Sequence, residues 1–485
     1  MNDTWFQILA ALPPLLVALT IIGLFVTLCI ARHERLVYAM TVGGLNLALV
    51  ATIALIPLGA VGVTPLYVVD FYTLFFWGVI LVATLAGAAF AAPYLSGLDD
   101  RREEFYILLA TSALGAMSLV AARHFGSLFV GLEALSIPLY GMVAYTFRTR
   151  ASLEAGFKYM ILSGVASSFL LFGMALLYGA TGSLAFADMM PAGGIDAPAS
   201  SWMLMGIGMM LIALTFKLSL VPFHVWTPDV YEGAPAPVGT FLATVSKAAV
   251  FAVLLRLFFT APAAANAWLL TLVGVLAFVS MLAGNLLALR QDNLKRLLGY
   301  SSIAHLGYLL TTLVAGTGLS AEAVAVYLAT YVGTSLGAFG VVSLVSSPFA
   351  GKDAAHIDHF RGLFHHRPVL AVSMALMMLS LAGIPLTMGF IGKFYILSVT
   401  MNAGLWWLSA GVIIGSGIAL FYYLRVMAVL FMERPVHARN LDQAAPGSNW
   451  ATTVIWLLAA ATILMGIYPN PLIELSALAG LSLGF

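Results

Sequence analysis

The chain has 485 residues, of which 62% are hydrophobic and only 8% are charged, and its mean hydropathy is +1.02. Soluble domains carry roughly 25% charged residues, so this composition indicates a polytopic membrane protein. The net charge of +1, without a basic patch, excludes a nucleic-acid or acidic partner, and a single cysteine, Cys29, excludes internal disulfides, cysteine-ligated clusters and cysteine-rich zinc sites.

Apolar segments of membrane-spanning length recur along the whole chain. The first has no basic region before it and no small-residue cleavage site after it, so we expect it to be retained rather than removed as a signal peptide. Because about 20 apolar residues cross a membrane as a helix, the sequence predicts an all-α membrane domain over 1–485 with about fourteen spans. The predicted spans are 6–30, 37–58, 72–95, 105–122, 126–147, 157–180, 201–222, 239–260, 267–289, 297–316, 322–346, 368–399, 405–430 and 450–469.

Lysines and arginines gather on one side of these spans. If the N-terminus lies outside, the outer connections hold Arg123 alone. The opposite side then holds Arg32, Arg35, Arg101, Arg102, Arg148, Arg150, Lys158, Arg290, Lys295, Arg296, Lys352, Arg361, Arg367, Arg425, Arg434 and Arg439. Since cytoplasmic loops carry the excess of basic residues, this asymmetry predicts that both termini lie on the outer side.

The stretch from 214 to 256 places Lys217, His224 and Lys247 inside otherwise apolar, helix-length sequence. Pro222 should free the carbonyl of Leu218, next to Lys217, and disturb the helix there. Non-helical backbone at membrane depth is tolerated only where it is buried in protein or lines a watery cavity, and an ionisable residue there is a functional hypothesis by default. The stretch therefore indicates ion movement beside a broken helix.

A second interruption lies in the other half of the chain. Gly383 and Pro385 break the predicted span 368–399, and Lys393 follows within the same apolar run. Interrupted helices at corresponding places in two halves are typical of inverted-repeat transporters. We therefore expect two inverted five-helix repeats, over 105–260 and 267–430, with the seventh and twelfth helices broken.

Glu133 is the only acid well inside a predicted span, roughly 10 Å deep at 1.5 Å per residue. It could form a static ion pair that pins two helices, or a functional pair with Lys217 in which each charge keeps the other ionised. Lys247 lies similarly deep. A charge at a helix centre costs about 2.5–3.5 kcal/mol, so Glu133, Lys217, Lys247 and Lys393 together suggest a use for these charges.

Other ionisable residues allow more than one interpretation. His305 suits a proton relay because its pKa lies near neutrality, although a single buried histidine can also be a satisfied core residue. His224 could gate the break or serve as a hydrogen-bond partner for freed carbonyls. Arg256 and Lys158 are expected to extend to the membrane surface rather than to join a pathway.

The connection after the eleventh predicted span contains four histidines, which are His356, His359, His365 and His366. A metal site is conceivable there, but no cysteine accompanies the histidines, so we interpret the segment as a solvated loop. No phosphate-binding loop or dinucleotide fingerprint occurs.

Four stretches of this sequence resemble one known family. They are FKLSLVPFHVWTPDVYEGAPAPV, the pair Ser246–Lys247, NLKRLLGYSSIAHLGY and SLAGIPLTMGFIGKFY. The chain is similar, over nearly its whole length, to the proton-conducting antiporter-type subunits of respiratory complex I and of multisubunit sodium/proton antiporters. Within the family, Lys393 and the end of the chain at Phe485 favour the subunit type with a lysine in the twelfth helix and no long C-terminal lateral helix.

The resemblance assigns roles to four residues. It implies that Glu133 is the family's glutamate of helix 5, Lys217 the lysine before the helix 7 break, Lys247 the central lysine of helix 8, and Lys393 the lysine of broken helix 12. Protons would enter from the cytoplasm, occupy the lysine line through water chains and leave on the outer side.

The resemblance also implies a translocase subunit of the bacterial inner membrane, without a redox cofactor of its own. NAD, FMN, iron–sulfur clusters and quinone would be bound elsewhere in the complex. The implied partners are the antiporter-like subunit M, the small subunits K and J, and lipids. Two rival functions stay open at this point, a sodium/proton antiporter subunit and a membrane scaffold whose buried charges only hold helices together.

Overall fold

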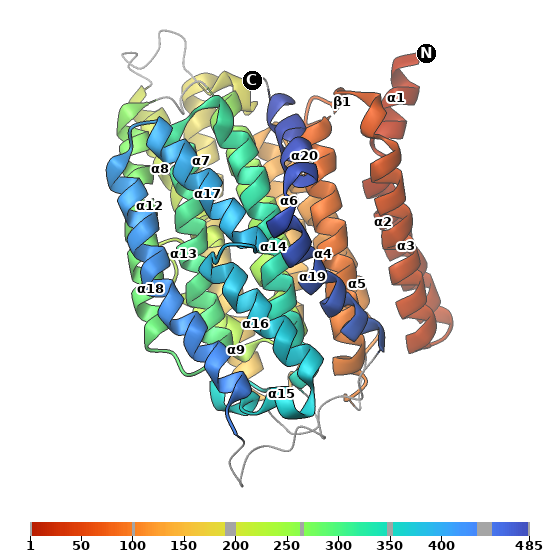
Figure 1. The fold of residues 1–485 in the computed structure, drawn as a ribbon. Coiled ribbons are helices and arrows are strands. Elements are labelled where there is room, and N and C mark those ends of the chain that lie inside the picture. The colour runs from red at the N-terminus through yellow and green to blue at the C-terminus, as the bar shows by residue number, and fades with distance from the viewer. Residues whose placement is uncertain are drawn as a thin grey trace.

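Long apolar helices run side by side through most of the molecule, as the computed structural model shows (Figure 1). The structure describes residues 2–98, 102–189, 200–261, 266–346, 353–433 and 449–483. Among these residues, twelve helices are long and apolar enough to cross a membrane, and the shorter apolar helices Glu104–Val120 and Pro368–Ala382 lie between them. The predicted all-α polytopic membrane fold is therefore confirmed.

The first half of the chain, up to the end of the first broken region, contains a short β-hairpin as well as helices. Its elements are α1 (Asn2–Ala10), α2 (Leu12–Ile30), α3 (Glu34–Ala54), η1 (Ile56–Leu58), β1 (Val61–Thr64), β2 (Tyr67–Val69), α4 (Phe71–Leu95), α5 (Glu104–Val120), α6 (Phe125–Val143), α7 (Arg150–Thr181), η2 (Phe186–Asp188), α8 (Ser200–Leu218), α9 (Trp226–Gly233), α10 (Ala236–Phe241), the π-helical turn η3 (Leu242–Ser246) and α11 (Lys247–Thr260).

The named elements of the second half are all helices. Its elements are α12 (Ala267–Leu289), α13 (Leu294–Ala315), α14 (Gly318–Val345), η6 (Ile357–Phe360), α15 (Leu363–His366), α16 (Pro368–Ala382), α17 (Met388–Asn402), α18 (Trp406–Phe431), α19 (Asn449–Ile467) and α20 (Asn470–Leu481).

Most predicted spans match helices to within a few residues, and the differences have local causes. The span predicted at 6–30 is divided into α1 and α2, with Pro13 at the start of the second helix. The span predicted from 157 begins at Arg150, because a polar first turn continues the helix beyond the apolar window. The span predicted at 201–222 ends at Leu218, and this earlier end shapes the candidate site below.

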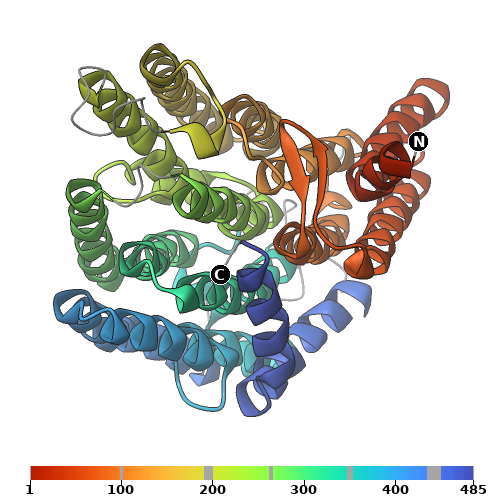
Figure 2. The same ribbon diagram turned by 90° about the horizontal axis from the view of Figure 1, so that it is seen from above.

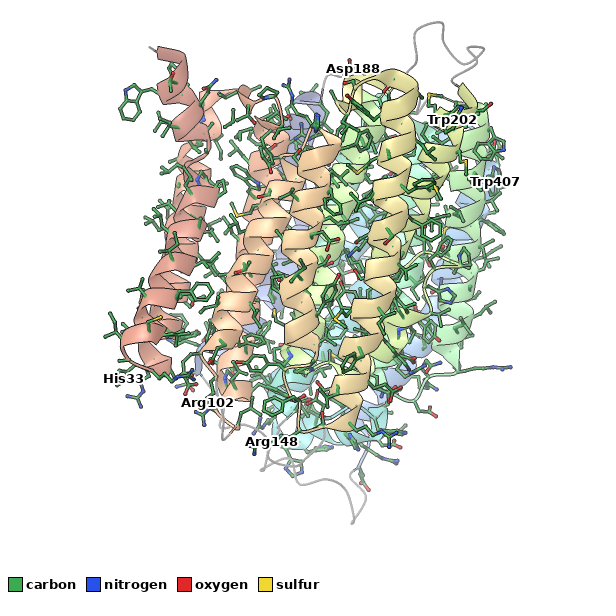
Figure 3. All side chains as sticks on the ribbon, turned by 180° about the vertical axis from the view of Figure 1, so that it is seen from behind. His33, Arg102, Arg148, Asp188, Trp202 and Trp407 are labelled. Carbon is green, nitrogen blue, oxygen red and sulfur yellow. The ribbon has the colours of Figure 1, made fainter. Side chains whose placement is uncertain are left out.

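Both ends of the chain lie at the same end of the helix bundle (Figure 1). Seen from behind, His33, Arg102 and Arg148 lie at the opposite end, whereas Asp188, Trp202 and Trp407 lie on the side of the termini (Figure 3). Arg102 and Arg148 thus lie at the end of the bundle away from the termini, as the sequence predicts. Four of the basic residues assigned to that side lie outside the described residues, namely Arg101, Lys352, Arg434 and Arg439.

One helix forms the centre of the molecule. The continuous span Ala236–Thr260, made of α10, η3 and α11, is completely buried, whereas α2 is only 17% buried and stands at one edge with α1 and α3 (Figure 2). Exposed leucines and phenylalanines cover the outer helices, where lipid or neighbouring subunits replace water. Lys247, at the start of α11, is therefore in the most enclosed part of the fold.

Arg256 does not reach the membrane surface as the sequence analysis expected. It is 3% exposed and binds the carboxylate of Asp70 through both terminal nitrogens, at 2.7 and 2.9 Å. Burial tends to raise the pKa of Asp70, but the charge of Arg256 and hydrogen bonds from Arg256 and Thr73 hold that pKa below its ordinary value. The expectation was wrong because its partner, Asp70, lies far away in the sequence.

Candidate functional site

The first broken helix ends at Leu218, four residues before Pro222. Ser219 has a φ of 61°, a left-handed conformation that is rare for a residue with a side chain. The carbonyl of Phe216 accepts hydrogen bonds from the Ser219 amide at 2.9 Å and from the Trp226 indole at 3.0 Å. Side chains and turns therefore satisfy the last carbonyls of α8, and they fix the position of the break.

Lys247 donates to the end of this broken helix. Its ammonium lies 2.8 Å from the carbonyl oxygen of Lys217, contacts the hydroxyl of Ser219, and stands 5.0 Å above the centre of the Trp226 ring. The freed carbonyl that carries the contact is that of Lys217, rather than that of Leu218 as predicted from Pro222. A cation at a helix C-terminus also meets the negative end of the helix dipole, so the break stabilises the charge of Lys247.

Lys217 points in the other direction, toward α6 and α7. Its ammonium donates to the hydroxyls of Ser136 at 2.7 Å and Ser163 at 2.6 Å. Glu133 lies one turn from Ser136 and accepts a hydrogen bond from Ser167, which lies one turn from Ser163. The predicted partners Glu133 and Lys217 thus share one polar cluster, but no ion pair within 4.0 Å joins them in the described part of the chain.

The second break repeats the same contact. Helix α16 ends at Ala382, Gly383 takes a left-handed conformation with φ of 83°, and α17 begins at Met388. The ammonium of Lys393 lies 2.9 Å from the Ala382 carbonyl oxygen and 5.5 Å from the centre of the Tyr308 ring. In both halves a buried lysine therefore caps the C-terminus of a broken helix and stands over an aromatic ring.

His305 lies between these two lysine sites in the chain and has hydroxyl partners on both ring nitrogens. Its Nδ1 is 2.7 Å from the Tyr327 hydroxyl and its Nε2 is 3.1 Å from the Tyr423 hydroxyl, which also contacts Ser301. A histidine between two hydroxyls can accept a proton at one nitrogen and donate one at the other. The same contacts also satisfy a buried core histidine, so both interpretations from the sequence remain compatible with the geometry.

A small polar cavity adjoins His305. Its volume is about 10 Å³, which is about the space that one water molecule needs. It is lined by His305, Tyr327, Thr330, Tyr331, Thr334, Ser380, Leu381 and Gly389. The cavity therefore brings the surroundings of His305 into contact with both segments of the second broken helix, α16 and α17.

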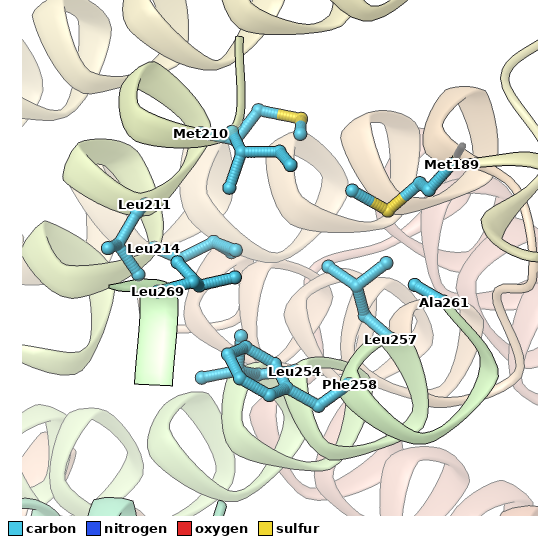
Figure 4. Close-up of a pocket in the computed structure, with 10 residues that line it drawn as sticks. Met189, Met210, Leu211, Leu214, Leu254, Leu257, Phe258, Ala261 and Leu269 are labelled. Carbon is cyan, nitrogen blue, oxygen red and sulfur yellow. The ribbon is translucent and has the colours of Figure 1, made fainter. Parts of the chain in front are cut away.

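A larger pocket, of about 30 Å³, lies between α8, α11 and α12 (Figure 4). Its lining is aliphatic and aromatic apart from two methionines, with Leu211, Leu214, Leu254, Leu257 and Phe258 around it. Its lining offers no hydroxyl, amide or charged side chain to a proton, so we do not assign it to the pathway.

His224 and the histidines after the eleventh predicted span have no contact with the lysine sites among the hydrogen bonds of the described residues. His224 is half-buried in the first break, and no hydrogen bond joins it to Lys217 or Lys247 within the described ranges. His356 and His359 cap the short helix η6, and the described residues contain no group of three or more His, Cys, Asp or Glu side chains that could hold a metal. The described part of this segment is thus not a simple loop, because it forms the short helices η6 and α15.

The partners of the lysines were not apparent in the sequence. Ser136, Ser163, Ser167 and Ser219 supply hydroxyls, and backbone carbonyls supply the rest. The only available signal was helical spacing, because Glu133 and Ser136, like Ser163 and Ser167, are three or four residues apart and so lie on one helix face. An ammonium surrounded by hydroxyls and carbonyls can release a proton to water and recover it, which is the chemistry of a proton relay rather than of covalent catalysis.

Comparisons with known proteins identify the family of the chain. Residues 122–419 match the family model described as NADH:quinone oxidoreductase/Mrp antiporter, transmembrane. The chain is 54% identical over 472 residues to NADH-quinone oxidoreductase subunit N from Chromohalobacter salexigens, with 96% of this chain and 98% of the relative covered.

Solved structures show the same fold. A chain of respiratory complex I from Thermus thermophilus, solved with bound aureothin, is 34% identical and superposes with a TM-score of 0.82 over 96% of this chain and 99% of that one. A chain of an archaeal membrane-bound sulfane sulfur reductase is 26% identical, with a TM-score of 0.84 and 98% of each chain covered. A chain of the Mrp complex from Dietzia sp. is 21% identical, with a TM-score of 0.85 over 98% of this chain and 97% of that one, which shows a shared fold alone.

Proposed function

Because the chain belongs to the NADH:quinone oxidoreductase/Mrp antiporter family of membrane subunits, we propose that it is the N-type subunit of a proton-pumping NADH:quinone oxidoreductase and carries protons through Lys217, Lys247 and Lys393. The N-type assignment rests on the 54% identity over nearly the full length of a curated subunit N. Lys393 supports it further, because the related subunit M carries a glutamate in helix 12.

One observation carries the proton-transfer proposal. Lys247 and Lys393 each donate to the last carbonyls of a broken helix, at 2.8 and 2.9 Å. An ammonium held in this way gains its stabilisation only while it is protonated, since a neutral amine has one donor fewer and no charge for the helix dipole to stabilise. Gain and loss of a proton are thereby linked to the geometry of each break.

Glu133 has the role of a nearby negative charge. It lies one helical turn from Ser136, which binds Lys217, and it accepts a hydrogen bond from Ser167, so it opposes the lysine charge without a direct bond. His305, with hydroxyls on both sides, would pass protons between the two halves. His224 would act at the break itself, as a gate or as a partner for freed backbone groups.

This subunit cannot drive transport by itself. Moving one charge against 100 mV costs about 2.3 kcal/mol, so uphill transport needs energy from a coupled reaction. We propose that this energy comes from electron transfer between NADH and quinone in other subunits, which hold NAD, FMN, iron–sulfur clusters and quinone. The chain would then be a translocase subunit without a redox centre.

The same proposal places the chain in a bacterial inner membrane. Its neighbours would be subunit M, the small subunits K and J, and lipids. Both termini would face the periplasm, because the basic connections lie at the opposite end of the bundle (Figures 1 and 3). We also propose that 105–260 and 267–430 form the two inverted repeats, one with each broken helix.

Co-purification tests the assignment. The protein is solubilised in mild detergent from its native membrane and isolated through a C-terminal tag. We expect it to migrate with a complex that oxidises NADH and contains iron–sulfur clusters. Isolation with membrane subunits that catalyse sodium/proton exchange and have no NADH-oxidising activity would instead establish the antiporter function.

A further inference from the structure

The short helix α9 lies inside the first break and contacts the lysine site at one of its ends. Trp226, its first residue, lies under the Lys247 ammonium and donates to the Phe216 carbonyl at 3.0 Å. Thr227 donates to the hydroxyl of Ser219, which also contacts Lys247. The position of α9 therefore determines the surroundings of Lys247.

The other end of α9 is held by the first turn of α13, which belongs to the second half of the molecule. Asn293 donates to Glu232 at 2.9 Å. Arg296 donates to Asp229 and to Glu232, both at 2.8 Å. Three separate hydrogen bonds from one helical turn thus reach two carboxylates of an eight-residue helix.

A buried lysine completes this contact. Lys295 is 1% exposed and donates at 2.8 Å to the carbonyl of Ala234, the residue that follows α9. The same ammonium binds the Asp353 carboxylate at 2.8 Å, and the hydroxyl of Tyr94 donates to the other oxygen of that carboxylate. Lys295, which the sequence assigned only to the basic side of the spans, therefore caps α9 as Lys247 caps α8 and Lys393 caps α16.

We propose that Asn293, Lys295 and Arg296 form a clamp on α9 that positions Trp226 and Thr227 around Lys247. They are positioning residues, because none of them touches the Lys217 or Lys247 ammonium. The clamp joins the first break to α13, which carries His305 about 15 Å farther along the helix. A displacement of α13 is thereby transmitted to Lys247 in the other half.

The main test changes one donor of the clamp in the intact complex. Asn293→Asp keeps the side-chain oxygen that caps α13 through the amides of Lys295 and Arg296, but it replaces the donor to Glu232 with a second negative charge. We expect amide hydrogen exchange in residues 226–234 to become about tenfold faster, and NADH-driven proton uptake per NADH oxidised to fall. Adding Glu232→Gln restores an amide donor to the pair and should reverse both effects.

Two control variants, Asn266→Asp and Tyr94→Phe, distinguish loss of the clamp from a general loss of stability. Asn266→Asp makes the same change at the N-cap of α12, which faces no carboxylate among the described residues, and should leave exchange in α9 and pumping unchanged. Lys295→Met should speed exchange in α9, whereas Tyr94→Phe, which removes the hydroxyl at the far end of the Asp353 contact, should not.

The clamp proposal is refuted if the amide hydrogens of α9 exchange at the wild-type rate in both Asn293→Asp and Lys295→Met. The proposal is also refuted if amide exchange in α9 becomes faster in these variants while proton uptake per NADH oxidised stays normal. It is refuted as well if Asn266→Asp lowers proton uptake per NADH oxidised as much as Asn293→Asp does. The inference rests on the proposed proton transfer, and the two can fail separately. Normal pumping by a Lys247→Ala complex refutes the transfer through Lys247 whatever happens in α9, whereas unchanged α9 exchange refutes the clamp alone.

Discussion

Gly383→Ala perturbs the second break without replacing any ionisable residue. Gly383 has φ of 83°, and a Cβ atom built there would lie 2.7 Å from Cδ of Lys393 and 3.3 Å from its Nζ. The methyl group therefore enters the space of the lysine side chain. Because this chain is flexible, we expect Lys393 to move away from the Ala382 carbonyl while the helices keep their packing.

The size of the effect follows from two contributions. A residue with a side chain in the left-handed conformation costs roughly 1–2 kcal/mol, which is a cost to stability alone. Loss of a hydrogen bond to a charged group costs roughly 1.5–3 kcal/mol. At 1.4 kcal/mol per factor of ten, the second contribution lowers the occupancy of the Lys393–Ala382 contact by roughly tenfold to hundredfold.

Gly316→Ala provides the matched control. Gly316 also ends a helix in the left-handed conformation, with φ of 56°, but a Cβ there would meet only a backbone oxygen at 4.0 Å. Inverted membrane vesicles carrying each variant are assayed for the pH gradient that NADH generates, beside NADH oxidation and the amount of assembled complex. We expect both variants to lose a little stability and only Gly383→Ala to lose proton pumping. Equal pumping by the two variants would refute the role of the Lys393–Ala382 contact.

Three further outcomes are expected. Glu133→Gln should lower pumping more than Glu433→Gln, a neutral swap at the end of α18, because only Glu133 opposes the charge of Lys217; equal losses would tell against that cluster. Ser219→Gly and Ser219→Ala both remove the hydroxyl beside Lys247, so both should lower proton pumping to the same extent. The glycine variant should be more stable than the alanine variant by roughly 1–2 kcal/mol, because glycine adopts the left-handed conformation without strain. Normal pumping by the glycine variant would show that the hydroxyl is dispensable. Partial burial tends to raise the pKa of Asp229, but bonds from Lys158 and Arg296 hold that pKa below 3.8, so its stabilisation of α9 is complete above pH 3.8 and is lost as the pH falls through the lowered value. Above pH 3.8, amide exchange in α9 should therefore be slower in the wild type than in Asp229→Asn, and this difference should shrink as the pH falls below that value. Equal exchange rates in the two proteins above pH 3.8 would exclude this contribution.

The sequence predicted the places where the helices break, because proline and glycine act locally. Pro222, Gly383 and Pro385 mark both interruptions correctly, and the depth of Lys247 and Lys393 follows from counting residues along a helix. The helix end at Leu218 was not predictable in the same way. It depends on Trp226 and the left-handed Ser219, which satisfy the last carbonyls before the chain reaches Pro222.

Contacts between helices could not be derived from the sequence. Lys217 binds Ser136 and Ser163 rather than Glu133 directly, because the register of α6 against α7 places the serines nearest to the ammonium. Arg256 and Lys295 appeared to be boundary residues, yet each is buried against an acid that is remote in the chain, Asp70 and Asp353. A single sequence shows which charges are buried, whereas their partners depend on packing.

Lys247→Ala tests the central claim most directly. Lys247 lies at the start of α11 in the fully buried central span and donates to the end of α8, so its loss removes the ammonium that joins the first break to the central span. The complex is purified, reconstituted into vesicles and assayed for NADH-driven proton uptake beside NADH:quinone turnover, with Arg290→Ala at an exposed helix end as the control. The account predicts an assembled complex with greatly reduced uptake for Lys247→Ala and normal uptake for Arg290→Ala. Normal uptake at normal turnover by the Lys247→Ala complex would contradict it.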